Sequence, residues 1–161
     1  MKNILVIFFL PLWVFLFSSN ATAADFQAKV IHIVDGDTIT VLNATKKKIK
    51  IRLNGIDCPE KAQAYGNKAK QFTKNLVAGQ MVTIQAYDQD KYGRTIGGVI
   101  LDDGRNLSQE LVKAGYAWWY RKYAPGNTVL EKLETVAREA KTGLWSDPHP
   151  IPPWDFRHRG G

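Results

Sequence analysis

Two short acidic segments contain side chains that could hold a metal ion or accept a proton. Asp35 and Asp37 flank a glycine, and Asp57 and Glu60 enclose a short segment farther along the chain. Hard cations such as Ca²⁺ prefer carboxylate, carbonyl and water oxygens as ligands. Asp37 and Asp57 could share one ion if the strand ends that carry them lie side by side. Each segment alone fits an ordinary turn at least as well, because Asp-Gly is a common turn sequence.

Two arginines could bind phosphate near these acids. The alternation over residues 48–53 puts Arg52 on the face opposite the apolar residues, and Arg94 ends the polar segment 91–94 at the start of another strand. The planar guanidinium fork matches the oxygens of a phosphate group. A single strand arginine is more commonly just a solvated side chain, so neither one decides the function by itself.

Alternation of β-branched and polar residues predicts strands, and longer apolar stripes predict helices. The expected strands are 26–34, 38–42, 48–53, 81–87 and 94–101, and the expected helices are 66–78, 107–114 and 128–141. Gly97 and Gly98 would mark a bend or bulge in the last strand. These elements fit an α+β fold: an OB-fold-type, five-stranded antiparallel β-barrel with about three helices.

The two ends of the chain differ from the middle. Residues 1–23 have the pattern of a secretory signal: Lys2, then an apolar run, then a small-residue cleavage site at Ala21 to Ala23. This pattern predicts an exported protein, periplasmic or secreted. A membrane anchor is the alternative, but the run is short and contains Pro11, so we expect cleavage and no anchor afterwards. Residues 24–145 would form the domain, and 146–161 a proline-rich C-terminal tail along its surface.

Charge and cysteine content narrow the possible roles. The 161 residues suit a single domain, and the net charge of +7 favours contact with polyanions such as nucleic acid. Cys58 is the one cysteine, so an internal disulfide is excluded, and burial of its thiol is the commoner outcome.

The order of these motifs resembles that of the staphylococcal nuclease (thermonuclease) family. Asp-Gly-Asp-Thr is followed by Arg52, by Asp-Cys-Pro-Glu and by Lys-Tyr-Gly-Arg, and the resemblance runs from about Phe26 to Trp145. It implies a Ca²⁺ site formed by Asp37, Asp57 and the backbone carbonyl of Cys58.

The resemblance also implies the remaining roles. Glu60 corresponds to the family's general base, Arg52 and Arg94 to its catalytic arginines, and Tyr92 and Tyr123 lie in stretches that contact nucleotide. The implied reaction is hydrolysis of DNA and RNA to 3′-phosphate products by a monomer. The segment between Glu60 and Tyr65 is shorter than in familiar members, and the tail after Trp145 has no sure counterpart, so neither is given a function.

Two other functions stay open on these residues. A non-catalytic OB-fold module that binds nucleic acid would share the barrel and the basic charge. A phosphodiesterase for small nucleotides would share the site, although the positive charge argues mildly against it.

Overall fold

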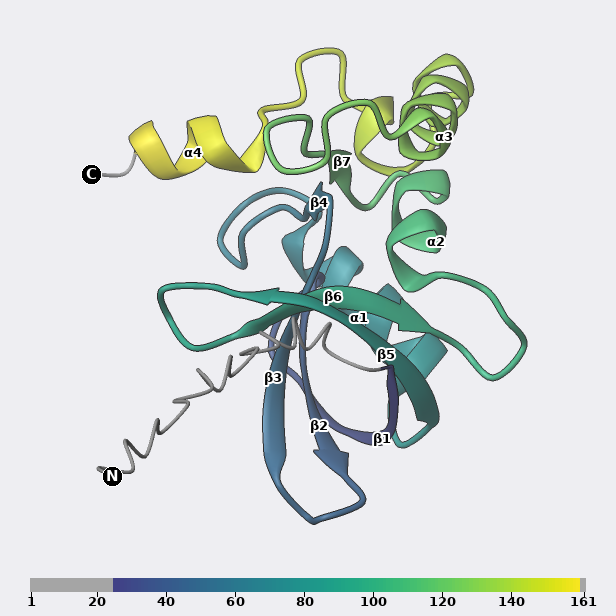
Figure 1. The fold of residues 1–161 in the computed structure, drawn as a ribbon. Coiled ribbons are helices and arrows are strands. Elements are labelled where there is room, and N and C mark those ends of the chain that lie inside the picture. Colours follow the sequence, from purple (N-terminus) through teal and green to yellow (C-terminus); the bar gives the residue numbers. More distant parts are fainter. Residues whose placement is uncertain (1–24, 160–161) are drawn as a thin grey trace, which may run out of the picture.

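The computed structural model describes residues 25–159 (Figure 1). The predicted signal segment 1–23 lies outside these residues and stays a prediction. Among the residues described, no helix is long and apolar enough to cross a membrane. A β-barrel forms one part of the molecule, and helices pack outside it and beyond one of its ends.

Five strands close the barrel in the order β1-β2-β3-β6-β5. Their bounds are Phe26–Ile33 for β1, Thr38–Asn43 for β2, Lys48–Leu53 for β3, Met81–Gln89 for β5 and Thr95–Ile100 for β6. All the expected strands are present, and their ends shift by two residues at most. The OB-type α+β barrel predicted from the sequence is therefore confirmed.

One property of the expected barrel needs correction, because the strands are not all antiparallel. β3 and β6 run parallel, with Ile51 opposite Thr95 and Leu53 opposite Gly97, whereas the other neighbouring pairs are antiparallel. A closed ring with an odd number of strands cannot reverse direction at every pair. A parallel seam is thus a geometric requirement of the closure.

Alternating side chains fill the barrel. In β3, Ile51 and Leu53 are buried while Lys48 and Lys50 are exposed, which confirms the alternation expected there. The β5–β6 pairing shifts register beside Ala86, which lies opposite a glycine of β6, so the bend expected at the glycine pair is also confirmed.

The three expected helices are present, and four short elements were not expected. The former are α1 (Gly66–Val77), α2 (Leu107–Lys113) and α3 (Thr128–Glu139). The latter are β4 (Ile56–Asp57), β7 (Trp118–Trp119), the 3₁₀ helix η1 (Gly143–Ser146) and α4 (Pro153–Arg159). β4 and β7 pair with each other, and α3 and α4 lie at the same end of the molecule (Figure 1). β4, β7 and η1 are too short to show a periodicity in the sequence. α4 is as long as α2, but it lies in a proline-rich segment, a composition typical of irregular structure.

A buried carboxylate joins α3 to β7. Glu134 is 1% exposed, and its Oε1 accepts the backbone N–H of Trp119 at 3.1 Å. Its Oε2 lies 3.0 Å from Nη2 of Arg121 and 3.4 Å from Nη2 of Arg138. Because β7 pairs with β4, this contact also supports the strand that carries Asp57.

Replacing this carboxylate should weaken the fold. Glu134→Ala leaves the Trp119 N–H without its buried acceptor and removes packing, so we expect the free energy of unfolding to fall by about 2 kcal/mol or more. Urea unfolding measures the change. Glu139→Ala, at an exposed position of the same helix, should change it by less than about 0.5 kcal/mol. Equal effects of the two substitutions would contradict this role for Glu134.

Candidate active site

The turn between β1 and β2 positions Asp37. The backbone N–H of Asp37 donates to Oδ1 of Asp35 at 3.2 Å, and the carbonyl of Gly36 accepts the Thr73 hydroxyl of α1 at 2.6 Å. A Cβ at Gly36 would come within 2.8 Å of the Cys58 sulfur. The glycine therefore lets this turn pack against the second acidic segment.

A backbone hydrogen bond brings the two acidic segments together. The N–H of Cys58 donates to Oδ2 of Asp37 at 2.7 Å, across 21 positions of the chain. Asp57, the residue before it, is held by the pairing of β4 with Trp118 of β7. The side-by-side placement of Asp37 and Asp57 that the sequence allowed is thus present.

Arg52 lies between the two aspartates. Its Nη1 is 3.1 Å from Oδ2 of Asp37, and its Nη2 is 2.8 Å from Oδ1 of Asp57. Nη1 also donates to the carbonyls of Leu53 and Ile56, at 3.1 and 3.0 Å. The side chains of Arg52, Asp37 and Asp57 are 16%, 7% and 2% exposed. This largely buried guanidinium contacts both acids.

Burial and charge shift the pKa values of this group. Burial raises the pKa of Asp57, and the hydrogen bond from Arg157 and the charge of Arg52 offset only part of that shift. Burial, together with the neighbouring Asp37 carboxylate, raises the pKa of Asp35 to about 6. Burial by itself would lower the pKa of Arg52, but Asp37 and Asp57 outweigh it and raise that pKa.

Glu60 lies at the open edge of the group and meets a residue that sequence reasoning missed. Its side chain is 40% exposed, and its Oε1 accepts Nη1 of Arg157 at 2.6 Å. Nη2 of the same arginine is 2.7 Å from Oδ2 of Asp57. Arg157 belongs to α4, in the tail to which no function was given. The basic run of Arg157, His158 and Arg159 was the one sign in the sequence.

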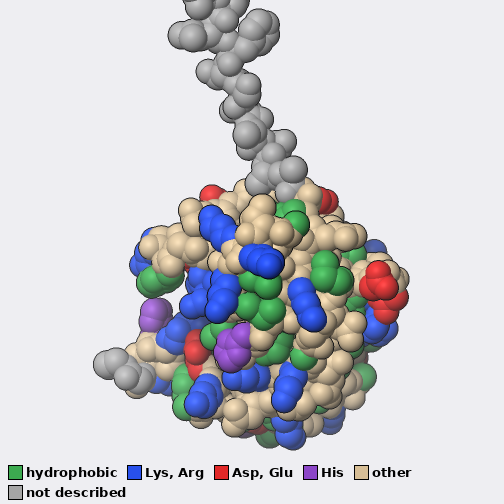
Figure 2. Space-filling view, turned by 90° about the horizontal axis from the view of Figure 1, so that it is seen from below, with side chains coloured by type: hydrophobic (Ala, Val, Ile, Leu, Met, Phe, Trp, Pro, Cys, Tyr) green, Lys and Arg blue, Asp and Glu red, His purple; other side chains and the backbone are tan. Residues whose placement is uncertain are grey.

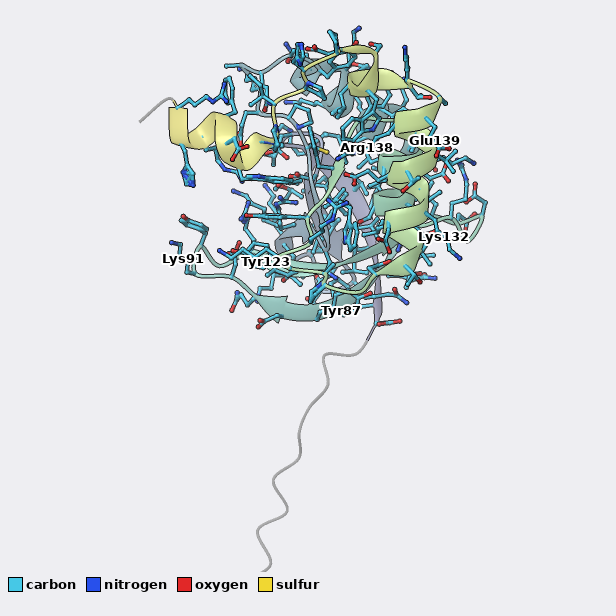
Figure 3. The ribbon with its side chains drawn as sticks, turned by 90° about the horizontal axis from the view of Figure 1, so that it is seen from above. Tyr87, Lys91, Tyr123, Lys132, Arg138 and Glu139 are labelled. Carbon is cyan, nitrogen blue, oxygen red and sulfur yellow. The ribbon has the colours of Figure 1, made fainter. Side chains whose placement is uncertain are left out.

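The other expected site residues belong to segments outside this group of contacts. The Nε of Arg94 pairs with Oδ2 of Asp90 at 2.6 Å, in the hairpin between β5 and β6. Tyr92 in that hairpin is 72% exposed, and Tyr123 is 62% exposed. The tip of this hairpin, marked by Lys91, projects on the same side of the molecule as α4 (Figure 3). The structure therefore gathers Asp37, Asp57, Cys58, Arg52 and Glu60, and leaves both tyrosines at the surface.

The carboxylate oxygens of this group are of the type that hard cations prefer as ligands. The carboxylates of Asp37 and Asp57 converge on one guanidinium, and a second guanidinium bridges Asp57 and Glu60, so cations already occupy the contacts that such a site would offer. Among residues 25–159, no cluster of three or more His, Cys, Asp or Glu side chains has the arrangement of a metal site. The expected third ligand, the Cys58 carbonyl, is a backbone atom.

The sequence pattern of a known family covers most of this domain. Residues 50–147 match the family described as staphylococcal nuclease homologues. The chain belongs to the staphylococcal nuclease family. The matched region contains Arg52, Asp57, Glu60 and Arg94, while Asp37 precedes it.

Individual relatives agree with this membership. A protein of Escherichia coli named an uncharacterized endonuclease is 45% identical over 151 residues, which are 94% of this chain and 97% of that protein. A protein of Shigella flexneri named micrococcal nuclease is 39% identical over 143 residues, 83% of this chain and 82% of its own length. The membership supports a nuclease, a phosphodiester hydrolase acting on nucleic acid, over the alternatives left open above.

Because Cys58 is buried, we expect its thiol to be unreactive in the native protein. The residue is 4% exposed, as expected from the sequence, and burial raises its pKa well above the usual value. Reactivity requires an accessible thiolate. An aromatic disulfide reagent should therefore fail to label the native protein and should label one thiol in denaturant. Labelling of native protein at the rate of the denatured chain would contradict this.

Proposed function

We propose that the protein is an exported, calcium-dependent nuclease that hydrolyses DNA and RNA to 3′-phosphate products and acts as a monomer. One observation carries the proposal: Asp37 and Asp57 are buried on either side of Arg52, and Glu60 lies beside them at an exposed edge. Buried acids beside an exposed acid supply two chemically different kinds of carboxylate. Export rests on the signal-like residues 1–23.

The buried acids are proposed to hold the metal ion. Asp37, Asp57 and the Cys58 carbonyl would be its protein ligands, since all three offer hard oxygens. When bound, a calcium ion supplies charge that polarises a phosphoryl oxygen. The hydrogen bond from the Cys58 N–H to Asp37 keeps that carboxylate oriented.

The remaining residues act on substrate and water. Glu60, being partly exposed, can orient a water molecule or accept its proton as the oxygen attacks phosphorus. Arg52 stabilises negative charge that grows on the phosphoryl oxygens. Arg94 can do the same once its hairpin brings it to the phosphate and its guanidinium exchanges Asp90 for substrate.

Exposed aromatic and basic side chains would hold the nucleic acid. Tyr92 and Tyr123 present rings on which bases can stack. Lys and Arg side chains predominate over Asp and Glu on the face seen in Figure 2, which fits attraction of a polyanion.

The role of Glu60 is tested by Glu60→Gln. The amide keeps the size of the side chain but cannot accept the proton, so the rate of DNA cleavage should fall by about a hundredfold or more. The melting temperature should change little because the side chain is 40% exposed. Glu139→Gln serves as the control and should cleave normally. A Glu60→Gln protein as active as wild type would remove Glu60 from the mechanism.

The metal and product assignments are tested together on end-labelled DNA and RNA. Cleavage of both should require Ca²⁺, stop on addition of EGTA and return with excess Ca²⁺. Kinase and phosphatase treatment of the fragments should reveal 3′-phosphate ends. Cleavage unaffected by EGTA would contradict the calcium assignment, and 5′-phosphate ends would contradict the proposed bond cleaved.

A further inference from the structure

The C-terminal helix α4 is held firmly against the domain. Trp154 stacks on Tyr120 with ring centroids 4.8 Å apart and an interplanar angle of 13°. Trp154 and Trp118 pack in an edge-to-face arrangement with ring centroids 5.7 Å apart. Pro153 is buried, and the carbonyl of Ile151 accepts the side-chain amide of Gln63. These contacts place the helix beside the segment that carries Glu60, independently of Arg157.

From this position, Arg157 bridges two of the site's carboxylates. Its Nη1 contacts Oε1 of Glu60 at 2.6 Å, and its Nη2 contacts Oδ2 of Asp57 at 2.7 Å. The other oxygen of Asp57 accepts Nη2 of Arg52 at 2.8 Å. Both oxygens of Asp57 are therefore engaged by guanidinium groups, and Glu60 is tied to the same arginine.

Arg157 and a divalent cation cannot share these contacts without strong repulsion. An ion bound to Asp57 would lie within a few ångströms of the guanidinium, where like charges repel and the partly buried surroundings screen them poorly. The three acids Asp37, Asp57 and Glu60 face the positive charges of Arg52 and Arg157. A divalent cation would bind these acids most tightly when one of the two guanidinium groups moves away.

Arg157 is the group that can leave. It is 42% exposed, whereas Arg52 is 16% exposed and also bonded to two backbone carbonyls. Partly exposed ion pairs contribute little to stability, so a divalent ion can displace Arg157 without unfolding the helix. The aromatic contacts of Trp154 would keep α4 docked while the side chain swings into solvent.

We propose that Arg157 is a built-in competitor of the divalent cation: its guanidinium occupies Asp57 and Glu60 until the ion displaces it. The inference rests on the proposed function, which makes Asp57 a metal ligand and Glu60 the group that acts on water. Displacement by the ion releases both carboxylates together. The tail thereby sets the cation concentration at which the site becomes competent.

Calorimetric titration with Ca²⁺ tests the competition without reference to cleavage. Arg157→Gln should bind Ca²⁺ about three- to tenfold more tightly than wild type, since a partly exposed ion pair no longer opposes the ion. Arg157→Lys, which keeps the charge but lacks the fork, should lie between them. Arg159→Gln makes the same change of charge two residues away in the same helix, at another exposed position, and should shift the affinity less than about twofold.

A spectroscopic measurement follows the displaced side chain itself. In the NMR spectrum of the wild-type protein, the guanidinium signal of Arg157 can be identified by its loss in Arg157→Lys. As Ca²⁺ is added, its chemical shift should move to that of a solvated arginine. Melting temperatures should show that each variant is folded. Equal Ca²⁺ affinity of wild type and Arg157→Gln, with DNA cleavage intact, would overturn the competition and leave the proposed nuclease standing. If no variant binds Ca²⁺, both this inference and the proposed calcium dependence fail.

Discussion

Asp37 and Asp57 are buried carboxylates, and burial of a carboxylate is costly unless positive charge or strong hydrogen-bond donors lie beside it. Arg52 supplies that charge to both at once, and the Cys58 N–H adds a donor to Asp37. The rest of the site depends on this arrangement. The turn at Gly36 must approach Cys58 closely, and Arg52 must leave the barrel on the side opposite its core neighbours. Removal of Arg52 would leave the buried Asp37 without its paired cation and Asp57 with only the partly exposed Arg157.

The barrel and the appended helices position different parts of this group. β3 carries Arg52, and the β1–β2 turn carries Asp37, so these two are fixed by antiparallel pairing within the barrel. Asp57 depends instead on β7, which α3 holds through Glu134. The site therefore joins the barrel to the helical part. A substitution in α3 can displace Asp57 through β7.

Local patterns in the sequence predict the barrel strands and the orientation of Arg52, because alternation reports directly on which face of a strand is buried. Burial of Cys58 was also predictable. The parallel pairing of β3 and β6 follows from the closure of a ring with an odd number of strands. No local pattern in the sequence indicates it. β4 and β7 are too short for periodicity, and α4 lies in the proline-rich tail. The contact of Arg157 with Asp57 spans 100 positions of the chain. The pairing of Arg94 with Asp90 depends on the hairpin's conformation, which residue types alone do not specify. The catalytic roles of all these residues stay predictions.

The parallel pairing of β3 and β6 also bears on the order in which the molecule can fold. Contacts between distant segments form late, because a long stretch of chain must be ordered to close them. The barrel cannot close along this side before β6, which ends at Ile100, is available to pair with β3. Asp37, Arg52 and Asp57 all precede that point, whereas α4 is made after every other element described. Arg157 therefore comes from the last element of the chain that the structure describes, and it contacts carboxylates that earlier elements bring together.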